Sequence, residues 1–237
     1  MLTSFYSPLS VRLLRRLWLF ICQESLQPRS LAAGVMVGIF LVSIPVFFEA
    51  PLVRTFPWIS LALTGLWVGL GYRWLQEPQR MFWGETLLGF SWSWFAGSVY
   101  WGWLRWEPLY HLPVEAIGLP VVLWGLSRGQ HRIGNWFYLG SLLGTAVTDL
   151  YFYLAGVMPY WKRVMEVDPP QAIDILQEAL VQVQTPWGIL TAMLCAALLT
   201  IVALKSLRSF QIQHWVFGGA VIGTLMVDSL FGLAAVL

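Results

Sequence analysis

Long apolar segments recur along the whole chain and limit its fold more than any other feature. A helix needs roughly 20 mostly apolar residues to cross the hydrocarbon core of a bilayer. Because 58% of the residues are hydrophobic and only 11% are charged, this apolar surface is too large for one soluble core and must face lipid. The sequence therefore predicts an all-α integral membrane protein whose transmembrane domain occupies residues 31–237. About seven segments are candidate transmembrane helices, at residues 31–50, 56–75, 81–104, 113–127, 134–157, 187–204 and 214–237.

Positive charges between these segments predict the orientation of the chain. Loops that stay in the cytoplasm are enriched in Lys and Arg. With the N-terminus in the cytoplasm or stroma, ten Lys and Arg residues fall on the inner side and four on the outer side. This asymmetry depends on counting residues 113–127 as a span, although the segment is short and contains Gly118 and Pro120. We therefore expect seven spans, of which the fourth is tilted, broken or re-entrant.

Two amphipathic segments lie outside the predicted spans. In residues 1–30, apolar side chains recur at helical spacing beside arginines, which predicts a helix on the cytoplasmic or stromal membrane surface. Residues 158–186 form an outer polar segment, in which Asp168 is a candidate N-cap and Pro169 suits the first helical turn. This helix would run to about Gln184 with one apolar face. It is either a tether between spans or a docking surface or lid.

The fifth and seventh apolar segments share a sequence skeleton, W-x3-G-x3-G-T-x3-D-x2-F. Residues 136–157 align without gaps with residues 215–236, with nine identities in 22 positions. This match is consistent with a parallel duplication of helical hairpins, spans 4–5 and spans 6–7. The skeleton contains two small-xxx-small faces that predict close helix packing, within the chain or in a homo-oligomer. The glycines of these faces are Gly140, Gly144, Gly219 and Gly223.

Two acidic residues occupy equivalent positions of this skeleton. Asp149 and Asp228 each lie thirteen residues beyond the skeleton's Trp, or roughly 20 Å into the membrane. Thr145 and Thr224 precede them by one turn and share their helix face. A carboxylate at this depth must face the bundle interior with a partner or be protonated. The pair either lines a polar site for a cation or protons, or consists of two separate interhelical hydrogen-bonding groups.

Other chemistry-bearing patterns are weak. His111 and Glu115 are four residues apart at the outer edge of the fourth span, which predicts a hydrogen-bonded pair because two ligands do not define a metal site. The histidines fall near interfaces, so no mid-span haem ligands, and no other cofactor, are predicted. The sequence has no H-E-x-x-H, G-x-S-x-G or Walker A motif. We therefore expect a protein that is not an enzyme.

Three stretches carry a family resemblance: residues 111–120, residues 158–161 (Met-Pro-Tyr-Trp) and residues 184–188 (Gln-Thr-Pro-Trp-Gly). They resemble an uncharacterised family, a domain of unknown function, of polytopic integral membrane proteins from cyanobacteria and plastids. The resemblance covers most of the chain from the first span onward. It implies a photosynthetic host and a thylakoid, envelope or plasma membrane, and it assigns no site residue.

Two functions remain open at this point. The first is a scaffold or assembly factor in a photosynthetic membrane, with the lipid bilayer and other membrane proteins as partners. The second is a transporter or proton-coupled carrier for a small solute or cation, which would use Asp149 and Asp228. A net charge of +2 predicts no nucleic-acid partner.

Overall fold

The regular elements of the chain are all helical in the part that the structure describes. The computed structural model describes residues 28–167 and 169–236, and no strand occurs in them. The elements are α2 (Pro28–Ile44), η1 (Pro45–Glu49), α3 (Ala50–Thr55), α4 (Pro57–Leu75), α5 (Met81–Val99), η2 (Tyr100–Leu104), η3 (Pro108–Tyr110), α6 (His111–Glu115), η4 (Ala116–Gly118), α7 (Leu119–Ser127), α8 (Arg132–Leu154), α9 (Met158–Glu166), α10 (Pro169–Val183), α11 (Pro186–Ser206) and α12 (Ile212–Val236). The predicted N-terminal helix and the Asp168 N-cap lie outside the described residues.

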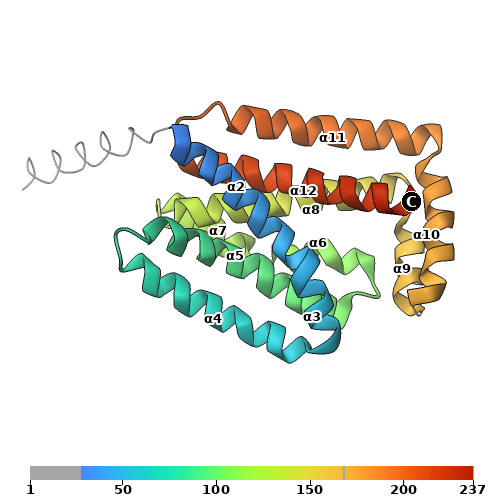
Figure 1. Ribbon diagram of the computed structural model, residues 1–237, viewed down its shortest axis with the longest axis horizontal. Coiled ribbons are helices and arrows are strands. Elements are labelled where there is room, and N and C mark those ends of the chain that lie inside the picture. The colour runs from blue at the N-terminus through green and yellow to red at the C-terminus, as the bar shows by residue number, and fades with distance from the viewer. Residues whose placement is uncertain (1–27, 168, 237) are drawn as a thin grey trace, which may run out of the picture.

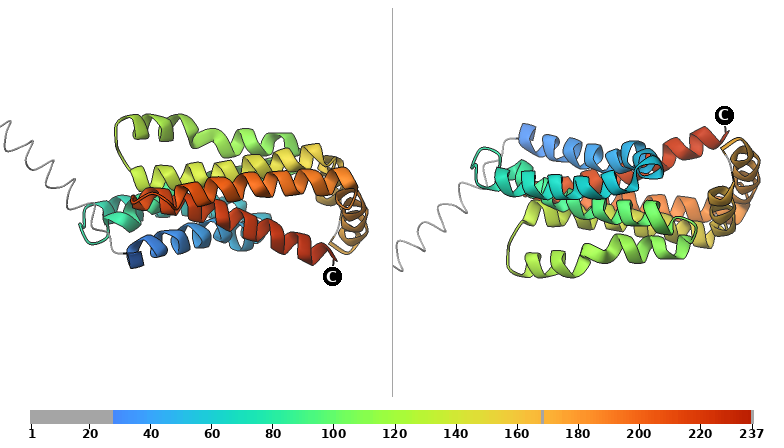
Figure 2. Two further views of the ribbon diagram at one scale, coloured as in Figure 1. Left: turned by 90° about the horizontal axis from the view of Figure 1, so that it is seen from above. Right: turned by 90° about the horizontal axis from the view of Figure 1, so that it is seen from below.

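The long helices form a bundle that is covered at one end. They run side by side along one axis, whereas α9 and α10 lie across the end of the bundle at the right of Figure 1. The views in Figure 2 show the same arrangement, with α6 and α7 along one side of the bundle beside α8. The α4–α5, α7–α8 and α11–α12 connections gather at the opposite end (Figure 1).

Several of these helices have the length and composition of membrane spans. Four helical stretches of the described residues qualify: Leu31–Thr55, Pro108–Ser127, Pro186–Ser206 and Ile212–Leu233. A fifth is obtained if α8 and α9, which are bent by 99°, count as one span. The protein is therefore an integral membrane protein. The predicted second span coincides with α4, and the third with α5 and η2. Neither α4 nor α5 qualifies, because Arg73 in α4, Glu85 in α5 and the Trp, Gly and Ser residues of both make them less apolar.

The predicted fourth span and the outer polar segment are both divided into shorter helices. The fourth span consists of α6 and α7 with the 3₁₀ turn η4 between them, and together with η3 they form one helical stretch, Pro108–Ser127. The outer segment consists of α9 and α10, and α10 ends at Val183, one residue before the predicted end.

The turn from α8 into α9 is built on a glycine. Gly156 has a φ of +73°, which L side chains rarely adopt. Its N–H bonds the carbonyl of Tyr153 at 3.2 Å, and the N–H of Val157 bonds the carbonyl of Phe152 at 2.9 Å. This pair of bonds is a Schellman motif, which ends a helix and redirects the chain. It directs α9 across the end of the bundle.

Glycines allow α2, α8 and α12 to approach closely. A Cβ atom at any of the four skeleton glycines would lie within about 3 Å of a neighbouring helix. Gly140 and Gly144 of α8 face α12, whereas Gly219 and Gly223 of α12 face α2. The equivalent glycines of the two copies thus contact different helices.

Replacing Gly219 by Leu is expected to prevent this packing. A Cβ at Gly219 would overlap the backbone of Val35, which cannot move aside without shifting α2. Overpacking of this kind typically costs about 1–3 kcal/mol or more. Gly65→Leu is the matched control, because a Cβ at Gly65 meets nothing within 4 Å. Size-exclusion profiles and thermal unfolding in detergent should show loss of folded protein for Gly219→Leu alone; equal behaviour of both variants would contradict the packing argument.

Candidate functional site

A histidine and an aspartate form a buried pair between α6 and α8. His111 Nδ1 lies 2.9 Å from Asp149 Oδ1 and 3.0 Å from Oδ2. Their side chains are only 14% and 9% exposed. Because Nδ1 faces two carboxylate oxygens, it carries the hydrogen of this bond. The imidazole gives Asp149 the partner that a carboxyl group inside a membrane bundle requires.

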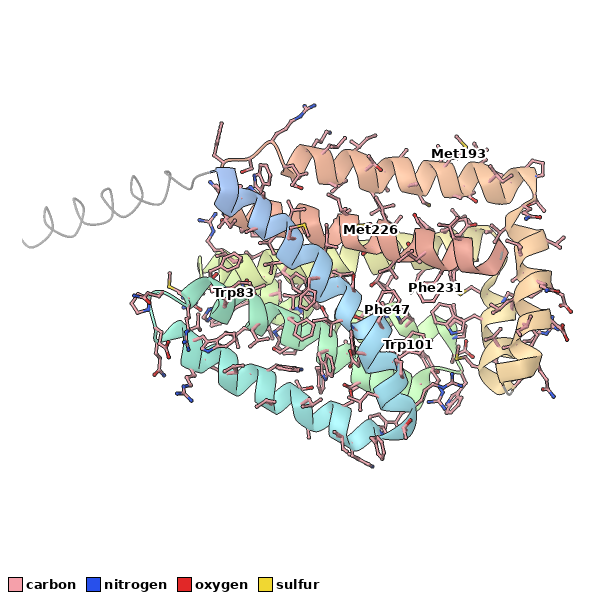
Figure 3. All side chains as sticks on the ribbon, viewed as in Figure 1. Phe47, Trp83, Trp101, Met193, Met226 and Phe231 are labelled. Carbon is pink, nitrogen blue, oxygen red and sulfur yellow. The ribbon has the colours of Figure 1, made fainter. Side chains whose placement is uncertain are left out.

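Aromatic rings enclose His111. The ring centroid of Tyr100 lies 4.6 Å from that of His111, and the ring of Trp161 lies 5.3 Å away. Trp101 stacks on Trp161, with centroids 5.9 Å apart and an angle of 11° between the planes. Figure 3 shows Trp101 at the end of the bundle nearest α9. Such an enclosure keeps water from the His111–Asp149 pair and strengthens its electrostatic interaction.

Glu115 adds a second acid one turn along α6. It interacts electrostatically with both His111 and Asp149. The Tyr138 hydroxyl of α8 donates to the backbone carbonyl of Glu115 at 2.5 Å, which fixes α6 against α8. His111 and Glu115 share helix α6, as predicted from their spacing. The predicted hydrogen bond between them is replaced by the bond from His111 to Asp149.

Asp228 has a different partner from Asp149. Its Oδ2 accepts a hydrogen bond of 2.7 Å from Thr148 of α8. Thr148 directly precedes Asp149, so successive residues of α8 engage α12 and α6. The structure therefore gives the two aspartates separate partners, although their carboxyl groups interact electrostatically.

The two threonines of the skeleton also have different surroundings. Thr224 packs on Gly144 and bonds the carbonyl of Ala220 at 3.3 Å, whereas Thr145 is half-buried. Neither forms a hydrogen bond with the carboxyl group one turn further along its helix.

A third acid, Glu49, is completely buried at the junction of η1, α4 and α5. Its side chain is 0% exposed. The Ser98 hydroxyl donates to Glu49 Oε1 at 2.7 Å, and the Ser60 and Ser98 hydroxyls lie 2.8 Å apart. Trp94 Nε1 donates to the Ser60 carbonyl at 2.8 Å and holds α5 to α4. The sequence analysis did not identify this cluster, because Glu49 is the last residue but one of the predicted span 31–50 and the two serines belong to other spans.

Two π-helices border these acidic groups. Glu49 ends η1, and Tyr100 begins η2. π-helical turns inside α-helices are frequently found at functional sites. Glu49 also interacts electrostatically with Glu115. We call Glu49, His111, Glu115, Asp149 and Asp228 the acidic network.

Ion pairs attach α9 over this end of the bundle. Lys162 donates to Glu107 at 2.9 Å and holds the pKa of that carboxyl below its ordinary value. Arg163 donates to Glu178 of α10 at 2.6 Å. Because these side chains are substantially exposed, the pairs orient α9 more than they stabilise it. Among the described residues, no cluster of three His, Cys, Asp or Glu side chains could hold a metal ion.

The comparisons with known proteins identify the family. The family model "Protein of unknown function (DUF3120)" matches residues 38–236, so the chain belongs to this family. No curated protein and no solved structure matches the chain. The predicted membership in an uncharacterised family is therefore confirmed, whereas the cyanobacterial and plastid range stays a prediction.

Proposed function

We propose that the protein is a proton-coupled membrane carrier for a small solute or cation. The observation that carries this proposal is the buried hydrogen bond between His111 and Asp149. Ionisable side chains are costly inside a membrane, and chains of Asp, Glu and His there are typical of proton relays in pumps and transporters. We infer that His111 and Asp149, with Glu115 one turn along α6, form such a relay. Asp228 and Glu49 bond hydroxyl groups instead.

Proton binding at this pair would change its net charge in a region with little water. Gain of a proton by Asp149 leaves the charge of a protonated His111 uncompensated, and loss of a proton by His111 leaves the charge of an ionised Asp149 uncompensated. Because uncompensated charge in this environment is costly, each protonation state favours a different packing of α6 against α8. Coupling of this kind allows a carrier to use a proton gradient.

The proposal includes the arrangement in the membrane. We propose seven spans, with α4 and α5 as the second and third, and an N-terminus on the cytoplasmic or stromal side. The alternation of the helix connections between the two ends of the bundle (Figure 1) supports this count. The membrane would be the thylakoid or plasma membrane of a photosynthetic organism. We also propose that spans 4–5 and spans 6–7 are two copies of one helical hairpin that arose by duplication.

A scaffold or assembly factor is the second candidate. It is favoured by α10, which turns apolar side chains outward: Ile173 is 57% exposed and Leu176 is 47% exposed. Exposed apolar side chains on an outer helix could contact a membrane-protein partner. In both candidates the protein is not an enzyme.

Reconstitution into liposomes tests the carrier proposal. The vesicles contain a pH-indicator dye, and a pH gradient is imposed across the membrane. External Na⁺, K⁺, amino acids and sugars are then added separately. The proposal expects at least one of them to change the internal pH faster than in protein-free vesicles. Identical rates throughout, together with a stable protein complex that Ile173→Asp disrupts, would favour the scaffold instead.

A further inference from the structure

We infer that Glu49, Ser60 and Ser98 form a binding site for a monovalent cation of the size of sodium. The site lies where η1, α4 and α5 meet, and the three side chains already form a connected hydrogen-bonded cluster. The identification of this cation as the transported ion rests on the proposed function. The binding of a cation by Glu49 does not depend on it.

The unpartnered oxygen of Glu49 is the observation that points to a ligand. Oε1 accepts from Ser98, but Oε2 is buried and has no hydrogen-bond partner. If the carboxyl group is ionised, Oε2 lacks a donor; if Oε2 is protonated, its hydrogen lacks an acceptor. Either state leaves a buried polar atom unsatisfied, at a typical cost of about 1–3 kcal/mol. A cation beside Oε2 satisfies this oxygen and neutralises the charge together.

The charge balance selects a monovalent ion. None of the ion pairs among the described residues includes Glu49. The ionisable neighbour with which it interacts is Glu115, another acid, so the surroundings provide no compensating positive charge. One bound positive charge neutralises one carboxylate, whereas a divalent ion would leave an excess charge inside the bundle.

The available ligand atoms suit a hard cation. Carboxylate and hydroxyl oxygens are the ligands that such ions prefer. Thr64 adds a further hydroxyl one turn from Ser60 on the same face of α4, and its Oγ1 is buried without a partner. Gly97 packs against the carboxyl group, where a Cβ would lie 2.9 Å from Oε2. A side chain at residue 97 would therefore overlap the carboxyl group, so α5 can lie this close to Glu49 only with a glycine there.

Thermal unfolding of the purified full-length protein in detergent tests the site. NaCl replaces choline chloride at constant ionic strength, and KCl is measured in parallel. We expect a saturable rise in Tm, of about 5 °C or more well above the Kd. Glu49→Gln should abolish the rise, and Ser98→Ala should raise the half-saturating concentration. Ser91→Ala is the matched control, because Ser91 is a buried serine of the same helix that bonds only its own backbone, at Leu88.

Several thermal-unfolding and infrared results would overturn the inference. A Tm that is equal in Na⁺, K⁺ and choline, or a Na⁺-dependent rise that persists in Glu49→Gln, excludes this site. If Glu49→Gln does not fold, an unchanged Na⁺ response in Ser98→Ala has the same meaning. An infrared band of a protonated carboxyl that Glu49→Gln removes and Na⁺ does not alter would show that Glu49 holds a proton. Cation binding without any transport would refute the carrier proposal and leave the site intact.

Discussion

Replacing Asp149 by Asn is expected to lower proton-coupled flux in liposomes at least about tenfold. Asparagine has the shape of aspartate, and its amide oxygen can still accept the hydrogen bond from His111 Nδ1, which now lies 2.9 Å from Oδ1. It cannot carry the negative charge or exchange a proton. The variant therefore removes the negative charge of the pair and keeps its packing.

Asp228→Asn provides the comparison for this variant. Asp228 bonds a hydroxyl, at 2.7 Å from Thr148, and has no imidazole partner. We expect it to retain a larger share of the flux than Asp149→Asn. Each variant is measured with its Tm and its yield after reconstitution. Wild-type flux in Asp149→Asn would contradict the proposed function, whereas loss of folded protein would assign Asp149 a structural role.

The general architecture was predictable because it depends on local composition. Apolar segments of sufficient length determine where helices can cross a bilayer, and Gly118 and Pro120 lie at the 3₁₀ turn of the fourth span. The number of spans was harder to predict from hydropathy. Helix α5 contains several Trp, Gly and Ser residues and is largely buried by its neighbours, so its sequence is not that of a lipid-facing helix.

The partners within the site were not predictable because they depend on rotations between helices. The sequence places Asp149 and Asp228 at equivalent positions, and symmetry favours a pair. In the structure, α6 begins at His111 after a 3₁₀ turn, and this start points the imidazole at Asp149, 38 residues along the chain. Glu49 escaped prediction for a related reason, since its π-helical turn and the two serines come from three separate elements.

The aromatic enclosure provides the second prediction with a large effect: Trp161→Ala should open His111 to water. Trp161 contacts the rings of His111, Trp101 and Phe152, so it closes the enclosure from α9. Truncating a well-packed Trp commonly costs about 3–5 kcal/mol and leaves a cavity. Here the cavity would lie between the buried pair and the solvent at this end of the bundle. His111 would then react with diethyl pyrocarbonate at least about tenfold faster, because its reactive nitrogen becomes hydrated.

The rate at each histidine can be followed by mass spectrometry of the labelled peptides. His131 and His214 lie in the connections or helix starts at the other end of the bundle and serve as internal standards (Figure 1). Trp58→Ala is the matched control, because this Trp is 71% exposed and its ring contacts Trp103 instead of the enclosure. Faster labelling of His111 alone, and only in Trp161→Ala, would identify α9 as the outer cover of the proton site. Unchanged labelling would mean that other residues exclude water from His111, and α9 would then have no gating role.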